Sequence, residues 1–116
     1  KEVIPPERCS YILGNPPFVG KHLMSDEQSA DMDAVWRGVK GSGLLDLVTG
    51  WYLKAADFVK GTQTPVAFVS TNSITQGEQV GVLWTELFKK EMKIHFAHRT
   101  FSWQSEARGK AHVHVV

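Results

Sequence analysis

Short apolar runs alternate along this chain with longer stretches in which apolar residues recur every three or four positions. The short runs are typical of strands, and the three- and four-residue spacing is typical of helices. The sequence therefore predicts strands at Tyr11–Leu13, Pro65–Ser70, Lys93–Arg99 and His112–Val116, and helices at Asp26–Arg37, Leu44–Val59 and Glu78–Glu91. This order of elements predicts an α/β fold in a single domain, residues 1–116.

Polar residues and glycines mark the ends of the predicted helices. Ser25 is a favoured N-cap residue, and Gln28 stands three positions later, where its side chain can return a hydrogen bond to the cap. We therefore expect a capping box at the start of the first helix. Gly38, Gly41 and Gly43 then indicate a flexible connection to the second helix.

The composition sets few limits on partners. The chain has 13 Lys and Arg against 12 Asp and Glu, so charge alone does not indicate nucleic-acid binding. One cysteine excludes an internal disulfide and fits a reducing compartment. Because no apolar run is long enough to span a bilayer, we expect no membrane association and a cytoplasmic location. His112 and His114 alternate on a strand rather than forming a compact donor set, so we expect no metal site.

The most informative segment is Tyr-Ile-Leu-Gly-Asn-Pro-Pro-Phe at 11–18. Here an apolar strand leads directly into Asn15 on a turn that Pro16 and Pro17 stiffen, because proline fixes its own φ and restricts the residue before it. Neither proline has a backbone N–H. The turn therefore presents the Asn15 side-chain oxygen and the Pro16 carbonyl with few competing donors, next to the ring of Phe18.

These groups suit an amine attached to an aromatic heterocycle. Such an amine is a poor nucleophile because its lone pair is delocalised into the ring, and oxygen acceptors stabilise the positive charge that develops on alkylation. Asn15 and Pro16 can supply these acceptors. Phe18 can stack on the heterocycle, a contact that contributes roughly 1–3 kcal/mol per base in nucleic-acid complexes. The simpler alternative is a rigid proline turn with a packing Phe.

The run Asn15, Pro16, Pro17, Phe18 resembles the Asn-Pro-Pro-aromatic motif of class I S-adenosylmethionine-dependent amino-methyltransferases, and most of all the adenine-N6 DNA methyltransferases of the MmeI-like, restriction-linked kind. The resemblance implies that these four residues are catalytic, that S-adenosylmethionine is the cofactor, and that DNA with a flipped adenine is the partner. It also implies a partial Rossmann-like sheet, mostly parallel with a terminal antiparallel hairpin and with helices on both faces. Similar loops occur in enzymes that methylate RNA or a protein glutamine, and a non-catalytic binding module is a further alternative.

A second polar loop follows the strand at 65–70. By the resemblance, Asn72 and Gln76 contact the target base or order the catalytic loop, although Ser, Thr and Asn here are equally suited to capping the next helix. Because the carboxyl ends of parallel strands meet at one edge of a sheet, we expect Asn15 and this loop to converge. Arg99 and Arg108, in or beside the final loop, are candidates for contacts with the DNA backbone.

The sequence contains no strand followed by a Gly-rich loop, the feature through which the family holds the methyl donor. The resemblance therefore implies a carboxyl-terminal catalytic half, with the donor-binding half upstream of Lys1 and with only Asn15 at the edge of the donor site. We expect the piece alone to be inactive. Without a neighbouring strand, Tyr11–Leu13 would leave an unpaired apolar edge, which favours self-association.

Overall fold

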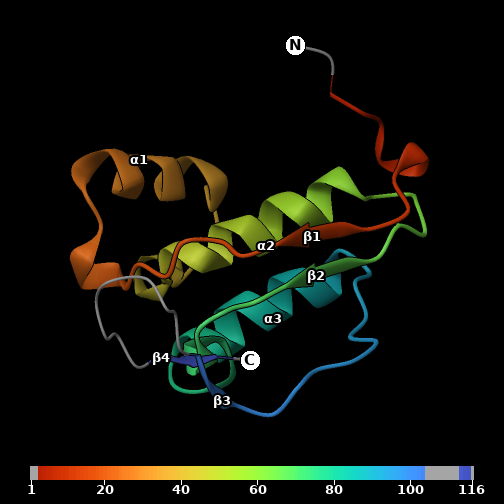
Figure 1. Ribbon diagram of the computed structural model, residues 1–116. Helices are drawn as coiled ribbons and strands as arrows, with labels where there is room; N and C mark the ends of the chain where they lie inside the picture. The colour runs from red at the N-terminus through yellow and green to blue at the C-terminus, as the bar shows by residue number, and fades with distance from the viewer. Residues whose placement is uncertain (1–2, 104–112, 116) are drawn as a thin grey trace.

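The computed structural model describes residues 3–103 and 113–115 (Figure 1). Three α-helices and four short strands follow one another in the order β1 (Ile12–Gly14), α1 (Asp26–Val35), α2 (Leu47–Phe58), β2 (Val66–Phe68), α3 (Gln79–Lys89), β3 (Phe101–Trp103) and β4 (Val113–Val115). Single 3-10 turns lie at Pro6–Arg8, Lys21–Leu23, Ser42–Leu44 and Asn72–Thr75. The predicted α/β class is confirmed, and each predicted helix is present with shifted ends.

β1 and β2 lie side by side as a parallel pair (Figure 1), with Ile12 opposite Val66 and Gly14 opposite Phe68. The chain passes from one strand to the other through α1 and α2. Both strands consequently end at the same edge of the sheet. The loops that begin at Asn15 and at residue 69 leave from this edge, so the predicted convergence of the two loops is confirmed.

The hydrophobic core lies among the three helices. Its buried residues come from α1, α2, α3 and the segments that connect them, and they are Met32, Trp36, Leu45, Val48, Leu53, Ala56, Ile74, Leu83 and Leu87. Apolar residues spaced by three and four positions place one face of each helix toward this core. The core therefore fixes the three helices relative to one another.

α2 and α3 both pack on one face of the β1–β2 pair (Figure 1). On this face Tyr52 of α2 lies edge-on to Phe68 of β2, with ring centroids 5.1 Å apart, and Trp84 of α3 lies 6.1 Å from Tyr52. Leu13 points to the opposite face because side chains alternate along a strand, and it is 73% exposed. The prediction of helices on both faces was therefore wrong for the described residues, because the two helices that flank β2 in sequence pack against each other on the same side.

The helix ends show which local patterns were informative. The predicted capping box is present: Ser25 Oγ accepts from the Gln28 N–H at 3.2 Å, and Gln28 Oε1 accepts from the Ser25 N–H at 3.0 Å. α1 ends at Val35, because Trp36 leaves the helix and becomes buried. α2 begins at Leu47 rather than at the predicted position 44, since the residues before it form a 3-10 turn and an extended link.

The last part of the chain differs most from prediction. Residues 93–99 form neither helix nor strand, and all of them are exposed. The antiparallel pair consists instead of β3 and β4, with Phe101 opposite Val115, and it forms a separate sheet that does not extend the β1–β2 pair. The predicted terminal hairpin is thus confirmed as a pair but not as part of the main sheet. Ile94 and Phe96 alternate with polar neighbours as in a half-buried strand, yet the two side chains are 55% and 71% exposed. Neither side chain is buried against the core.

Candidate active site at the carboxyl edge of the parallel strands

The loop Asn15–Phe18 leaves β1 at the carboxyl edge of the parallel pair. Before it, the Gly14 carbonyl accepts a hydrogen bond from the Val69 N–H at 3.1 Å. Asn15 is exposed, and its side-chain amide has no hydrogen-bond partner within the described residues. Pro16 is buried, Pro17 is exposed and Phe18 is half-buried. The fold therefore uses Pro16 for packing and leaves the Asn15 amide available to a ligand.

The segment after Phe18 is fixed to the start of α2. The Val19 carbonyl accepts from the Leu47 N–H at 3.0 Å, and the Lys21 N–H donates to Asp46 Oδ1 at 2.8 Å. Together with the strand hydrogen bond that precedes the loop, these bonds hold the loop at both ends. A short loop with two prolines and fixed ends has little conformational freedom to lose, so its backbone is positioned before any ligand binds.

Aromatic side chains fill the space beside Gly14. A Cβ built on Gly14 would lie 3.0 Å from Cδ1 and Cε1 of Phe68, so the glycine permits an approach that any side chain would disturb. Phe68 packs against Tyr52, whose hydroxyl lies 2.6 Å from Ser70 Oγ in a hydrogen bond. Burial raises the pKa of Tyr52, and the hydrogen bond between Tyr52 and Ser70 opposes this effect in part. Tyr52 is therefore a neutral hydrogen-bonding member of this cluster rather than an anionic base.

The Asp46 carboxylate joins three other segments. Besides the Lys21 N–H on Oδ1, Oδ2 accepts from Ser73 Oγ at 3.0 Å and from Gln79 Nε2 at 2.9 Å. Gln79 Oε1 in turn accepts from the Asp46 N–H at 3.1 Å. The loop after β1, the loop after β2 and the first residue of α3 consequently meet at one side chain.

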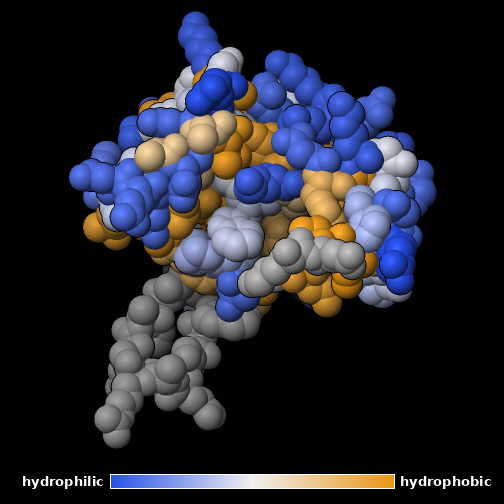
Figure 2. Space-filling model, turned by 90° about the horizontal axis from the view of Figure 1, so that it is seen from above, coloured by the Kyte–Doolittle hydropathy of each residue, from blue (hydrophilic) through white to orange (hydrophobic). Residues whose placement is uncertain are grey.

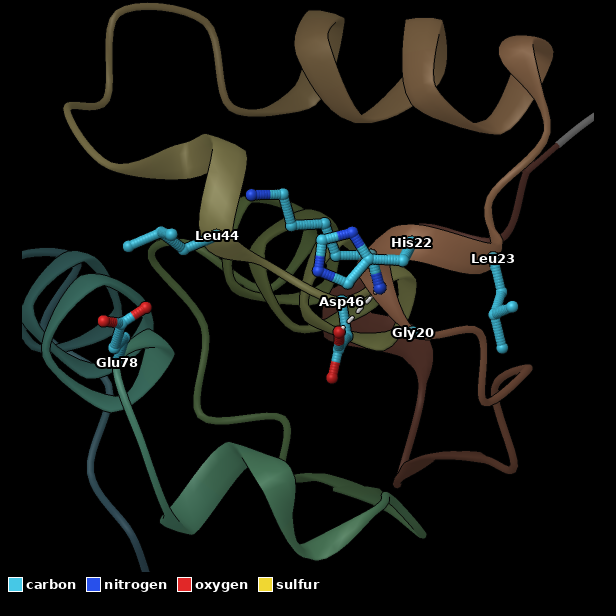
Figure 3. Close-up of a pocket in the computed structure, with 7 residues that line it drawn as sticks. Gly20, His22, Leu23, Leu44, Asp46 and Glu78 are labelled. Carbon is cyan, nitrogen blue, oxygen red and sulfur yellow. Dashed lines mark hydrogen bonds between the residues drawn. The ribbon is translucent and has the colours of Figure 1, made fainter.

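An open cavity of about 540 Å³ lies beside this carboxylate (Figure 3). Its lining residues are Gly20, Lys21, His22, Leu23, Leu44, Asp46 and Glu78. Figure 3 shows His22 next to Asp46, while Glu78 at the start of α3 lies on the other side of the space. Both acidic and basic side chains line the cavity, so its charge alone favours neither an anion nor a cation.

The second predicted loop lies where expected, but its polar side chains do not cap α3. Asn72 is half-buried at the start of the Asn72–Thr75 turn, and Gln76 is exposed directly after it. The hydroxyls of Thr71 and Ser73 bond to each other at 2.7 Å, and the N-cap of α3 makes no side-chain capping bond. Capping of the next helix, one of the two interpretations of this loop, is therefore not what these side chains do.

No described contact brings Arg99, the first of the two predicted arginines, to the site. Arg99 is exposed in the segment without helix or strand, and among the described residues it makes no ion pair. Arg108 lies outside the described residues. Within the described chain, no cluster of His, Cys, Asp or Glu could hold a metal ion.

Sequence reasoning missed the residues that organise the site. Asp46, Ser73, Gln79 and Tyr52 were not identified as candidates, although Asp directly before a periodic apolar run is a known helix-start pattern. Leu44 fits the same periodicity as the helix, so the predicted helix began at Leu44, two positions before Asp46. The contacts of Asp46 with Ser73 and Gln79 span 27 and 33 positions, so no local pattern could reveal them.

The surface carries several large apolar side chains in exposed positions. Those before and after the motif are Val3, Ile4, Tyr11, Leu13 and Leu23. Figure 2 shows apolar areas between hydrophilic ones on the face seen from above. Exposed apolar areas of this kind are typical of contacts with another surface. No helix in the described part of the chain is both long and apolar enough to cross a membrane.

Comparison with known proteins assigns the chain to a family. The family model described as "MmeI, DNA-methyltransferase domain" matches residues 1–116. The chain belongs to this family. A relative, DNA methyltransferase A of Bacillus subtilis (strain 168), is 43% identical over 106 residues, which is 91% of this chain and 12% of that protein.

A solved structure agrees with this membership of the MmeI DNA-methyltransferase domain family. The structure of the Type IIL restriction-modification enzyme MmeI in complex with DNA matches with a TM-score of 0.92 and 51% identity, over 97% of this chain and 15% of that one. The chain thus spans a small part of the length of both relatives. The resemblance to MmeI-like DNA methyltransferases is confirmed at the level of the family, while the target atom and the cofactor stay predictions.

Proposed function

We propose that this chain forms the methyl-acceptor side of an S-adenosylmethionine-dependent DNA methyltransferase that modifies adenine N6. The observation that carries the proposal is the exposed Asn15 amide, which has no partner within the described residues and stands on a loop held at both ends. Membership of the MmeI DNA-methyltransferase domain family supports the reaction class. The solved relative is in complex with DNA, which supports DNA as the acceptor.

In this proposal, Asn15, Pro16 and Phe18 act on the amine through position and charge. S-adenosylmethionine, when bound, would supply a methyl group from a positively charged sulfur: its bond to sulfur would break as the bond to N6 forms, and a neutral thioether would leave. The Asn15 side-chain oxygen and the Pro16 carbonyl accept hydrogen bonds from N6 and stabilise the positive charge that develops as the nitrogen forms its new bond. The surplus proton then leaves N6 to solvent. Pro17 keeps the turn rigid throughout.

The target adenine must leave the duplex, because its amine otherwise lies inside the base stack. Phe18 receives the extruded base by stacking on its ring. Asn72 and Gln76 lie on the loop that leaves the same sheet edge, and we infer that they contact the base or the motif loop. Arg99 and Arg108 stay candidates for phosphate contacts only, since no described contact brings Arg99 to the site.

The fit to the cofactor is limited to one edge. Asn15 stands at the carboxyl edge of parallel strands, where ligands of this fold bind, and its free amide suits a polar contact with the donor. The described residues include no strand followed by a Gly-rich loop. We therefore infer that most donor contacts come from residues outside this set, and that the 116-residue chain alone does not transfer methyl groups.

The test measures transfer of labelled methyl groups into duplex DNA by the natural full-length protein. Asn15→Ala should lower the rate by about 100- to 1,000-fold, the effect of losing one positioned group that stabilises developing charge. Phe18→Ala should lower it by about 5- to 150-fold, equivalent to one lost stacking contact. Gln63→Ala is the matched control, because Gln63 is an exposed amide before β2, at the opposite end of the strands.

Mass analysis of the digested DNA identifies the methylated atom. Label on adenine N6 supports the proposal, whereas label on RNA or on a protein glutamine would refute DNA as the acceptor. Full activity of both variants would refute the roles of Asn15 and Phe18. A natural protein that binds DNA but transfers no methyl group to any acceptor would favour a binding module.

We also propose that the isolated chain self-associates through β1. Among the described strands, β1 pairs only with β2, and Tyr11 and Leu13 are 69% and 73% exposed. Unpaired strand edges with apolar side chains pair readily with other chains. Sedimentation at increasing concentration should show dimers or larger species, which Leu13→Lys should reduce and Phe96→Lys, at an equally exposed site outside the strands, should not. A monomer at every concentration would contradict this proposal.

A further inference from the structure

All described hydrogen bonds of the Asp46 carboxylate go to other segments of the chain, and none goes to its own helix. Asp46 is the N-cap residue of α2, yet its side chain makes no capping hydrogen bond. Thr49 supplies the local contacts instead, because its N–H and its Oγ1 both donate to the Asp46 carbonyl, at 3.0 Å and 2.8 Å. An N-cap aspartate normally accepts from the first turn of its helix. Here the Asp46 carboxylate bonds to distant segments in place of the first turn of α2. A role in helix stability therefore does not explain these contacts.

The bonds of Asp46 link the two loops that leave the carboxyl edge of the strands. Oδ1 receives the Lys21 N–H, three positions after Phe18, and Oδ2 receives Ser73 Oγ, one position after Asn72. Gln79 locks the carboxylate by a pair of opposed bonds, one to Oδ2 and one from the Asp46 N–H. A charged acceptor makes shorter and stronger hydrogen bonds than a neutral one. The distance between the motif loop and the second loop therefore depends on this carboxylate.

We propose that Asp46 is a positioning residue that holds the Asn15–Phe18 loop in register with the Asn72–Gln76 segment. This inference rests on the function proposed above. Asp46 does not touch the reacting atoms: it acts through the Lys21 backbone and through Ser73. Methyl transfer requires the reacting atoms in a narrow geometry, and a displacement of the loop that carries the acceptors would slow the chemical step while leaving DNA binding intact.

The test uses the natural full-length protein and the nearly isosteric variant Asp46→Asn. The asparagine can keep its oxygen toward the Lys21 N–H, but its NH2 group then faces Gln79 Nε2, donor against donor. If Gln79 turns its amide over, the Asp46 N–H loses its acceptor instead. The double variant Asp46→Asn with Gln79→Glu removes this conflict, because a carboxylate at 79 accepts from both the backbone N–H and the new NH2 group. Asp57→Asn is the control on the same helix, since Asp57 pairs with Lys90 away from the loops.

Two measurements are made on each variant. Asp46→Asn should lower kcat by about 100-fold, the order expected for a misplacement of roughly 1 Å, with little change in KM for DNA. Hydrogen exchange of a peptide that covers 15–23 should become faster, because the donor conflict with Gln79 displaces the side-chain oxygen at position 46 that accepts from the Lys21 N–H. The double variant should restore both quantities in large part, and Asp57→Asn should change neither. An unchanged KM for DNA in Asp46→Asn shows that the single variant folds.

The outcomes separate this inference from the proposed function. Normal kcat in Asp46→Asn, or a loss that appears only in KM, would refute the positioning role. Unchanged exchange across 15–23 would refute the anchor itself, and so would a double variant that is as impaired as the single one. If the natural protein transfers no methyl group to DNA, the proposed function is refuted. Hydrogen exchange across 15–23 would still test whether Asp46 anchors the loop.

Discussion

Gly14→Ala tests whether the approach of β1 to Phe68 sets the end of the strand. The added Cβ would lie 3.0 Å from two ring carbons of Phe68, and the ring cannot retreat freely because Tyr52 packs edge-on against it at 5.1 Å. Overpacking of this kind costs about 1–3 kcal/mol. The φ angle of Gly14 is not positive, so alanine also stiffens the unfolded chain, a gain of about 0.4–1 kcal/mol. We expect a net loss of about 0.5–2 kcal/mol.

Hydrogen exchange in the natural full-length protein measures this loss locally. Peptides that cover β1 and β2 should exchange about 2- to 30-fold faster in Gly14→Ala. Gly81→Ala is the matched control: Gly81 lies exposed within α3, nothing lies within 4 Å of a Cβ built there, and alanine favours helix. It should slow exchange in α3 and leave the strands unchanged. Unchanged or slower exchange of the strands in Gly14→Ala would show that Phe68 yields without cost.

Three further predictions concern stability. Folding raises the pKa of Tyr52 above 10.0, so above that pH the unfolded chain loses a proton that the folded chain keeps. The melting temperature should therefore fall between about pH 9 and pH 11. The fall should be smaller in Tyr52→Phe. Ser25→Ala should destabilise the start of α1 by about 1 kcal/mol, seen as faster exchange there, and equal exchange would show that the capping box contributes nothing. Trp84→Phe removes the 2.7 Å hydrogen bond from Trp84 Nε1 to the Ile74 carbonyl, so the free energy of unfolding in urea should fall by about 1 kcal/mol. An unchanged free energy of unfolding would show that water replaces the indole as donor.

Local patterns predicted the elements of this fold where the pattern and the packing agree. The capping box at Ser25 and the apolar run that becomes β2 depend on neighbours in sequence, and both were predicted. The strand predicted at 93–99 had the correct alternation, but a strand also needs a partner edge and a surface to cover, and neither is encoded locally. The side of the sheet on which α2 and α3 pack likewise follows from long-range contacts.

The candidate site was predictable only in part for the same reason. The sequence indicated the Asn15–Phe18 loop and its convergence with the second loop, because strand order determines which loops meet. It did not indicate Asp46, whose role follows from contacts with Lys21, Ser73 and Gln79 that are distant along the chain. Roles that depend on residue type were thus visible in the sequence, and roles that depend on geometry were not.

The motif loop is anchored on Val69, Leu47 and Asp46, three residues at or beside the ends of β2 and α2 in this chain. Contacts within these 116 residues therefore set the geometry of the motif loop. Under the proposed function, exchanging the segments that read the DNA sequence between relatives should change which sites are modified and leave the turnover of a bound site unchanged. With the motif loop separate from the segments that read the DNA sequence, the target sequence could change while the motif loop stays the same.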